Sequence, residues 1–299
     1  MKRAKRISAG DEIAIVAPAS PFDRSLFQAS VAWLRKRGYR VRFDRGIFSK
    51  DDYLAGPDAR RSSELSRAFG SPASAVFCAR GGYGAMRLFL SQKPALSEKL
   101  FMGMSDVTPL LNAMAREHRM VSIHGPVLAG KLFSSLSESA RGRLFSLLES
   151  PREQVLRSGT DFETVIDGSF QGTLWGGNLC LLAATMGTRA AVMPGRDAVL
   201  FLEEVDEPPY RVDRMLTQLA LAGYLQRFSA IVLGDFTDTK GRRYRRGDLH
   251  ALIFGLLGRK TPPILSGVAS SHVRMKVLLP IGGQVRHHRG TLILPPLVS

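Results

Sequence analysis

The first half of the chain alternates short apolar runs with segments in which apolar residues recur at helical spacing. Residues 12–17 predict a buried strand that ends in a loop over 18–21. Asp23 predicts the N-cap of a helix that continues to about Arg37, and Gly38 predicts its end. Further strands are predicted over 39–43, 75–79, 99–103 and 121–126, with helices near 59–69, after 84 and after 105. Strands separated by helices of this length predict a parallel sheet covered on both faces, of the flavodoxin or Rossmann type.

After about residue 148 the pattern changes to short alternating segments, which predict strands and turns around two helices near 178–186 and 210–223. These strands are predicted over 163–167, 170–177, 198–204, 230–235, 263–265, 276–279 and 291–294. We therefore expect an α/β protein with two domains. An N-terminal parallel-sheet domain spans 1–148, a linker spans 149–161, and a smaller, β-rich mixed α/β domain spans 162–299.

Three unusual loops follow strands of the predicted parallel sheet, and the third of them carries a candidate nucleophile. In such sheets the ligand crevice lies beyond the carboxyl ends of the strands. The loops cover residues 18–20, 80–84 and 105–108. In the third, an apolar strand stops at Gly103 and delivers Ser105 into the start of a helix that Asp106 and Thr108 can open. A serine on so sharp a turn stands exposed beside backbone N–H groups that could stabilise an oxyanion. The alternative is that Ser105 belongs only to the cap of the helix.

Composition limits the cellular setting. The chain has 299 residues, of which 44% are hydrophobic, enough for a packed core larger than one average domain. Its two cysteines, Cys78 and Cys180, lie in apolar runs, which favours buried thiols over a disulfide framework, and two cysteines alone cannot make a structural zinc site. The basic N-terminus is not followed by the apolar region of a signal peptide, and no run of eighteen apolar residues occurs. We expect a soluble, cytoplasmic protein without a membrane segment.

The formal net charge of +16 admits two kinds of partner. An excess of lysine and arginine is typical of nucleic-acid binding, but it also suits an anionic small substrate. The basic residues are scattered, with one dense cluster over 240–246. No zinc-finger spacing, aromatic RNA-binding strand or basic zipper accompanies the cluster. A solvated arginine loop is the expected structure there, and nucleic-acid binding is the less favoured function.

Two further segments place polar residues where a core strand would not carry them. The apolar run 198–202 ends in four acids within five residues, at 203, 204, 206 and 207, and a lone histidine, His272, precedes another strand. Together with Ser105 these residues could form an activated nucleophile, in which the imidazole takes the hydroxyl proton and a carboxylate orients the imidazole. The acids could equally form a solvated loop or bind Mg²⁺ or Ca²⁺. Any of the six histidines could have a packing or surface role, as expected for His287 and His288.

Eight segments together make the chain resemble the LD-carboxypeptidases, a serine peptidase family that includes muramoyltetrapeptide carboxypeptidase and a microcin self-immunity peptidase. The segments include Ala-Arg-Gly-Gly-Tyr-Gly-Ala, Gly-Met-Ser-Asp-Val-Thr and Leu-Glu-Glu. They occur in the order of the family and cover residues 10–20, 79–85, 103–108, 124–126, 172–178, 202–204, 207–214 and 272–282. The arginine-rich segment 240–246 is the main departure from the family pattern.

This resemblance implies a role for each candidate residue. It implies Ser105 as the nucleophile, Glu203 as the orienting carboxylate and His272 as the base, with Glu204 the alternative because the two acids are adjacent. It also implies that the backbone amides of Gly82 and Asp106 bind the oxyanion.

A carboxypeptidase must in addition hold the free carboxylate of its substrate, for which Arg80 and Arg274 are candidates. The alternative for the 80–84 loop is a tight turn with a structural arginine. The implied reaction is release of the C-terminal D-Ala from a murein tetrapeptide by a homodimer, without metal or organic cofactor. The alternative substrate is a peptide–nucleotide conjugate, as for the immunity relative.

Overall fold

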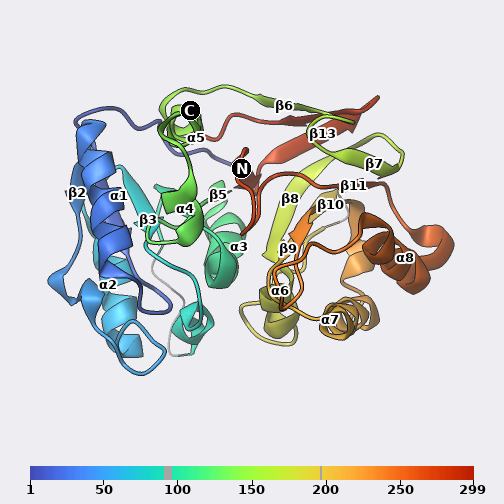
Figure 1. Cartoon of the computed structure of the whole chain (residues 1–299), viewed down its shortest axis with the longest axis horizontal. Helices are drawn as coiled ribbons and strands as arrows, with labels where there is room; N and C mark the ends of the chain where they lie inside the picture. Colours follow the sequence, from blue (N-terminus) through green and yellow to red (C-terminus); the bar gives the residue numbers. More distant parts are fainter. Residues whose placement is uncertain (91–95, 196) are drawn as a thin grey trace.

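The computed structural model describes residues 1–90, 96–195 and 197–299, and two β-sheets stand side by side in it (Figure 1). The first sheet has six strands in the order β12-β5-β4-β3-β1-β2. Neighbouring strands from β2 to β5 are parallel, as predicted, and β12 is antiparallel to β5. The strands are β1 (Glu12–Val16), β2 (Arg40–Arg42), β3 (Ala75–Cys78), β4 (Leu100–Gly103), β5 (Ser122–His124) and β12 (Leu279–Ile281).

The helices of this half follow from local sequence signals, as the first of them illustrates. The carboxylate of Asp23 accepts hydrogen bonds from the amides of Ser25 (2.7 Å) and Leu26 (3.0 Å), so it caps the helix as predicted. Phe27 is buried on its inner face, whereas Leu26 is only half-buried. The helices are α1 (Arg24–Lys36), α2 (Asp58–Gly70), α3 (Thr108–His118), α4 (Lys131–Ser135) and α5 (Glu138–Glu149), with 3₁₀ turns η1 (Arg45–Phe48), η2 (Ala85–Phe89) and η3 (Ser105–Val107).

The second sheet has eight strands in the order β6-β14-β13-β8-β9-β10-β11-β7. Its centre, β8 to β11, is parallel, and the outer strands pair antiparallel. The strands are β6 (Gln154–Arg157), β7 (Glu163–Ile166), β8 (Phe170–Asn178), β9 (Ala198–Glu204), β10 (Phe228–Phe236), β11 (Ile264–Ser266), β13 (Gln284–His288) and β14 (Thr291–Leu294). The helices are α6 (Leu179–Thr185), α7 (Pro209–Leu221) and α8 (Arg246–Leu257), with 3₁₀ turns η4 (Leu225–Arg227) and η5 (Gly258–Lys260).

Helix α3 lies where the two halves meet (Figure 1). It packs against β4 and β5 on one side and against β8 and α6 on the other. Because η3 leads directly into α3, the segment that begins with Ser105 faces the second sheet. The carboxyl ends of β4 and β9, where the candidate residues lie, are therefore brought toward the same junction.

Several elements differ from the predicted pattern. The strand predicted over 276–279 begins only at Leu279, and it joins the first sheet as β12 although it comes from the second half of the chain. Strand β6 lies within the segment predicted as a linker, and the boundaries 1–148 and 162–299 stay a prediction. Both cysteines are free thiols, as predicted; Cys78 is also buried as expected, whereas Cys180 is only half-buried. None of the helices within the described ranges combines the length and hydropathy needed to cross a bilayer.

Candidate active site

Ser105 lies on a sharp turn between a strand and a helix. β4 ends at Gly103, and Ser105 opens η3 with a φ of +65°, in the left-handed region that a side chain disfavours. Thr108 donates a hydrogen bond from Oγ1 to the carbonyl of Ser105 (2.7 Å) and thereby holds this turn. Strain of this kind costs about 1–3 kcal/mol and persists where the surrounding structure imposes it. The turn has the strand–turn–helix form of a nucleophile elbow, as the sequence predicted.

The 80–84 loop packs directly against this turn. A Cβ atom on Gly81 would lie 2.6 Å from Ser105 Cβ and 2.8 Å from its Oγ, so only glycine fits there. Gly82 has a φ of +101° and packs on Ser20, whose Oγ accepts a hydrogen bond from the amide of Tyr83 (2.9 Å). Within the described residues, neither the Gly82 amide nor the Asp106 amide is hydrogen-bonded to an acceptor. Neither N–H group is therefore committed to another acceptor in the described part of the chain, and their binding of an oxyanion stays a prediction.

The side chain of Asp106 has a separate task. Its Oδ2 accepts a hydrogen bond from the amide of Ala85 (2.7 Å), which fastens the end of the 80–84 loop to the start of the helix. Burial of the side chain raises the pKa of Asp106 to about 6. Its carboxylate therefore supports the loop and leaves the backbone amide of the same residue free.

Glu203 and His272 form a hydrogen-bonded pair. His272 lies in the loop after β11, and its Nδ1 donates to Oε2 of Glu203, the fully buried residue near the end of β9, at 2.7 Å. Burial by itself would raise the pKa of Glu203, but the contact with His272 holds it below its usual value. Burial by itself would lower the pKa of His272, and the Glu203 carboxylate more than offsets this, so that the pKa of His272 is raised. With Nδ1 committed to Glu203, Nε2 is the nitrogen available for proton transfer.

Glu204 points elsewhere, as the alternation of side chains along a strand requires. Its carboxylate accepts hydrogen bonds from Asn178 Nδ2 (2.7 Å), from the amide of Cys180 (2.7 Å) and from its neighbour Val205 (3.0 Å). Cys180 lies in the first turn of α6, so Glu204 binds the N-terminus of that helix. Burial raises the pKa of Glu204 to about 7. In residues 1–90, 96–195 and 197–299, no three His, Cys, Asp or Glu side chains come together as a group that could hold a metal ion.

Thr108 and Asn178 connect the Ser105 turn to the Glu203–His272 pair. The amide of Asn178 donates to Thr108 Oγ1 (3.1 Å), and Asn178 Nδ2 donates to Oε1 of Glu203 (3.4 Å). No direct hydrogen bond between Ser105 Oγ and His272 occurs in the described part of the chain. Sequence reasoning missed these two bridging residues. An asparagine between a strand and a helix could have been recognised as an N-cap, but not as the partner of Glu203.

A second carboxylate fixes the loop that carries His272. The buried Asp235, near the end of β10, accepts hydrogen bonds from Ser271 Oγ at Oδ2 (2.7 Å) and from Arg274 Nη2 at Oδ1 (2.6 Å). Ser271 Oγ also accepts from the amides of Val273 and Arg274 (3.2 Å each). Asp235 therefore holds both sides of His272. The substrate-binding role of Arg274 stays a prediction, and its guanidinium group is engaged here.

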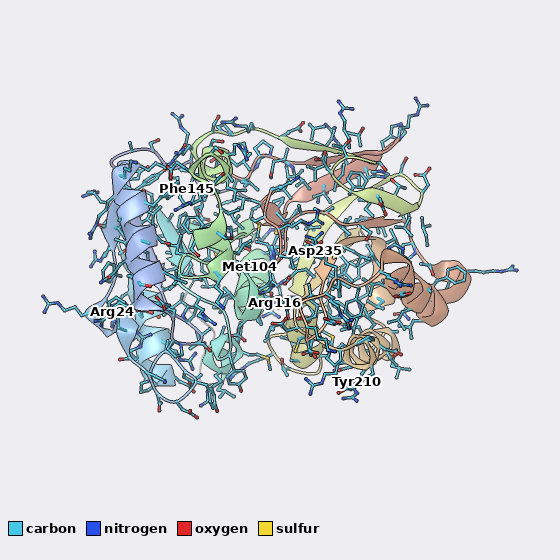
Figure 2. All side chains as sticks on the ribbon, in the orientation of Figure 1. Arg24, Met104, Arg116, Phe145, Tyr210 and Asp235 are labelled. Carbon is cyan, nitrogen blue, oxygen red and sulfur yellow. The ribbon has the colours of Figure 1, made fainter. Side chains whose placement is uncertain are left out.

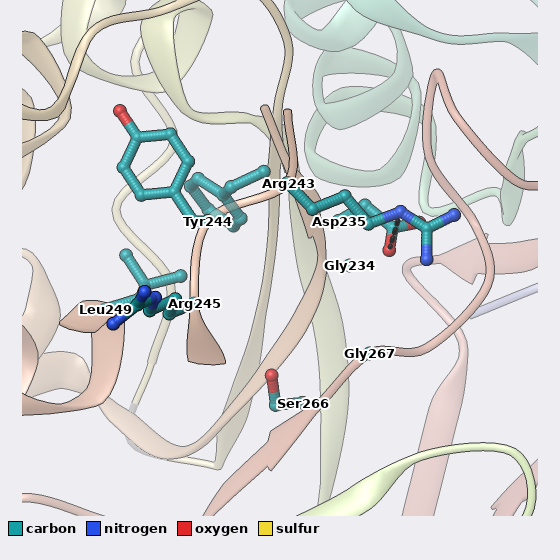
Figure 3. A pocket seen from close by; sticks show the side chains of 9 residues that line it. Gly234, Asp235, Arg243, Tyr244, Arg245, Leu249, Ser266 and Gly267 are labelled. Atoms are coloured by element: carbon teal, nitrogen blue, oxygen red, sulfur yellow. Dashed lines mark ion pairs between the residues drawn. The ribbon is translucent and has the colours of Figure 1, made fainter. Parts of the chain in front are cut away.

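The arginine-rich loop lies beside Asp235 (Figure 3). Arg243 Nε is 3.7 Å from Asp235 Oδ1, and Arg242 Nη2 pairs with Asp238 at 2.8 Å. The hydroxyl of Tyr244 donates to the carbonyl of Glu207 (2.7 Å), which anchors the loop to the segment after β9. Of the predicted cluster, the side chain of Arg246 lies outside the described residues.

The candidate residues come from both halves of the molecule. Met104, which directly precedes Ser105, and Asp235 both project onto the middle of the molecule, where the halves meet (Figure 2). Arg80, the other candidate for a substrate carboxylate, is exposed at the start of its loop, and no ion pair within the described ranges involves it. The site thus combines a serine turn and free amides from the first half with an imidazole–carboxylate pair from the second.

Comparisons with family models, with curated proteins and with solved structures all relate this chain to the LD-carboxypeptidases. Two family models match: the LD-carboxypeptidase N-terminal domain over residues 13–125 and the LD-carboxypeptidase C-terminal domain over 171–286. The murein tetrapeptide carboxypeptidase of Pseudomonas aeruginosa is 35% identical over 239 residues, which are 76% of this chain and 76% of that protein. The crystal structure of muramoyltetrapeptide carboxypeptidase from Oxalobacter formigenes is 29% identical, with a TM-score of 0.79, over 96% of this chain and 100% of that one. The microcin C7 self immunity protein MccF is 19% identical, with a TM-score of 0.86 and full coverage of both chains, which shows a common fold.

Proposed function

The chain belongs to the LD-carboxypeptidase family, and from this premise we propose that it is a serine carboxypeptidase that releases the C-terminal D-Ala from murein tetrapeptides. The observation that carries the proposal is the 2.7 Å hydrogen bond between His272 and Glu203, in a molecule whose serine turn presents Ser105 with two free amides beside it. This combination supplies a base, its orienting carboxylate, a nucleophile and an oxyanion site. The relatives named for murein tetrapeptide cleavage supply the substrate class.

The first half of the proposed reaction acylates Ser105. His272 Nε2 accepts the hydroxyl proton as Ser105 Oγ attacks the carbonyl carbon between the diamino acid and D-Ala. The amides of Gly82 and Asp106 donate to the oxyanion of the tetrahedral intermediate. His272 then gives its proton to the D-Ala nitrogen as the C–N bond breaks, which leaves an ester on Ser105 and free D-Ala.

The second half hydrolyses the ester. A water molecule attacks the ester carbonyl while His272 Nε2 accepts one of its protons, and the same amides hold the new oxyanion. The bond to Ser105 Oγ breaks, and the serine oxygen recovers the proton from His272. In both halves Glu203 keeps the imidazole oriented and stabilises its charged form. The sequence candidates for binding the free carboxylate of the substrate are Arg80, which is exposed, and Arg274, whose guanidinium group is bonded to Asp235.

The decisive experiment measures release of free D-Ala from L-Ala-γ-D-Glu-meso-diaminopimelyl-D-Ala. The wild type is compared with Ser105→Ala and with wild type treated with EDTA. Release that is lost in Ser105→Ala and retained in EDTA supports the proposal. Release that survives in Ser105→Ala contradicts the serine mechanism, and release that EDTA abolishes would favour a metal role for the acids after β9.

The alternative substrate is a peptide–nucleotide conjugate. Solved MccF structures hold glutamyl sulfamoyl guanosine and aspartyl sulfamoyl adenosine, and this chain shares their fold at 19% identity. The same triad would serve both substrates, so the test is competition. Cleavage of an aminoacyl sulfamoyl adenosine with a higher kcat/KM than that of the tetrapeptide would favour the alternative.

Nucleic-acid binding by the 240–246 cluster is the non-enzymatic alternative. Its test is retention on DNA and RNA as salt is raised, in wild type and in a variant with Arg242, Arg243, Arg245 and Arg246 changed to Ala. Absence of binding at physiological salt removes this function. The homodimer and the cytoplasmic location stay predictions, which sedimentation analysis and cell fractionation test.

A further inference from the structure

The proposed reaction assigns no role to the arginine-rich loop over 240–246, which lies beside Asp235 (Figure 3). The inference rests on the proposed function. Because His272 protonates the D-Ala nitrogen, the leaving D-Ala must lie on the His272 side of the site. Its carboxylate carbon is two bonds from that nitrogen, about 2.5 Å away. A cation that binds this carboxylate must therefore lie beside the 271–274 loop.

Two guanidinium groups contact Asp235, the carboxylate that fixes that loop, and they are not equivalent. Arg274 makes close hydrogen bonds to both carboxylate oxygens of Asp235, so its charge is matched. Arg243 makes only the 3.7 Å contact of Nε with the same carboxylate, and its side chain is 48% exposed. In the described part of the chain no hydrogen bond occupies the Nη groups of Arg243. Asp235 thus pairs with two guanidinium groups, and one of the two positive charges, that of Arg243, is not matched by a close carboxylate.

The directions of the arginine side chains show which of them extends toward the segment that carries His272. Arg243 extends across Asp235 toward the segment after Gly267, which leads to His272, whereas Arg245 turns the other way, toward Leu249 (Figure 3). Arg242 is turned to solvent and paired with Asp238. The pocket beneath Arg243 is lined by residues from the ends of β10 and β11, which include Asp235, Ser266 and Gly267.

We propose that Arg243 binds the α-carboxylate of the substrate's C-terminal residue and so makes the enzyme specific for a free C-terminus. A guanidinium group presents paired N–H donors that match the two oxygens of a carboxylate. Asp235 orients Arg243 from below and fixes the His272 loop through Ser271 and Arg274. The same buried carboxylate therefore sets the spacing between the carboxylate-binding group and the general acid.

The test compares the tetrapeptide with its C-terminal carboxamide, which lacks the charge but keeps the scissile bond. We expect the wild type to prefer the free acid. Arg243→Gln should raise KM for the free acid about 10- to 100-fold and leave the kinetics of the carboxamide nearly unchanged. Arg242→Gln, a neighbour of the same type, should keep the preference of the wild type. In a Ser105→Ala background, calorimetry should show the same loss of affinity for the free acid with Arg243→Gln.

Three outcomes would overturn the inference while the proposed function stands, and the first two concern the preference for the free acid. One is an unchanged preference for the free acid in Arg243→Gln, and the other is a collapse of that preference in Arg80→Gln instead. If the wild type releases no D-Ala from the tetrapeptide, the proposed function fails, and the inference fails with it. A uniform loss of activity on both substrates in Arg243→Gln would indicate a structural role and would also contradict carboxylate recognition.

Discussion

Glu203 and Glu204 are adjacent acids that do different things, although Asn178 Nδ2 donates to both of them. Glu203 accepts from His272, and Glu204 accepts from Asn178 and Cys180. We predict that Glu203→Gln lowers kcat about 10²- to 10⁴-fold, because the imidazole loses its acceptor and its stabilising charge. Initial rates of D-Ala release check this.

Glu204→Gln is the matched control for that substitution. Its amide would turn an N–H donor toward a buried backbone N–H or toward Asn178, at a cost of about 1–3 kcal/mol in the free energy of unfolding. Its kcat should stay within a few-fold of the wild type. If Glu204→Gln abolished turnover and Glu203→Gln did not, the orienting carboxylate would be Glu204.

The pKa of His272 sets the acidic limb of the pH profile. A general base must be neutral, so kcat/KM falls as the pH drops through the pKa of the imidazole. Because the Glu203 carboxylate raises the pKa of His272 above its ordinary value of 6.5, the midpoint of the wild-type limb should lie above pH 6.5. In Glu203→Gln that charge is absent, and the midpoint of the residual activity should move to lower pH. A midpoint that stays in place, or moves upward, would contradict the assignment.

At the residue scale, the sequence indicated the candidate reactive residues but not the residues that hold them in position. Ser105, Glu203 and His272 carry reactive groups in recognisable motifs, and the structure joins the last two directly. Thr108 and Asn178 lie in two of the recognised segments, but nothing local indicates that they bond to each other. Their function depends on the approach of α3 to β8, a contact between segments 70 residues apart in the chain that no local pattern describes.

At the scale of elements, the site depends on how closely the 80–84 loop approaches the serine turn. Gly81 has no steric freedom, because a Cβ atom would lie 2.6 Å from that of Ser105. We predict that Gly81→Ala lowers kcat about 10²-fold by displacing the nucleophile. The control is Gly70→Ala at the end of α2, where a Cβ atom meets nothing within 4 Å, and its kinetics should match the wild type. A kcat equal to that of the wild type in Gly81→Ala would show that the 80–84 loop can shift away from Ser105 without displacing the nucleophile.

Helices α1 and α2 and the buried parallel strands were predictable from a clear period, and Asp23 caps α1 as expected, whereas α5 has no counterpart among the predicted helices. Strand β12 was not predictable as part of the first sheet. It has three residues, and its partner β5 precedes it by more than 150 positions. α8 follows the arginine-rich loop without a pattern that separates it from that loop, and β6 lies in the polar stretch 149–161, whose composition predicts a linker. Strands as short as β6 and β12 are defined by their partners rather than by their own composition.

At the scale of the whole molecule, the two halves are linked by a strand that returns to the first sheet and by buried hydrogen bonds. β12 returns to complete the first sheet. Asn112 on α3 bonds both backbone groups of Gly176 in β8, donating to its carbonyl (2.9 Å) and accepting from its amide (3.1 Å). Both bonds are buried, and both would be lost if the halves separated. A site assembled from both halves needs this rigidity, because no direct bond between the serine turn and the imidazole occurs among the described residues.

The two tryptophans of the chain report on the two halves separately, since Trp33 lies in α1 and Trp175 in β8. We predict that thermal unfolding is one cooperative transition, so that fluorescence of Trp175 in Trp33→Phe and of Trp33 in Trp175→Phe falls in step with the far-ultraviolet circular dichroism of each variant. Asn112→Ala, made in each of these variants, should lower both midpoints together, because it removes a bond that belongs to the junction. Separate transitions would instead mean that the halves fold independently and that the site forms only when they dock. The predicted boundary at 149–161 would then be a true folding boundary, and Asn112→Ala should reduce activity without lowering either midpoint.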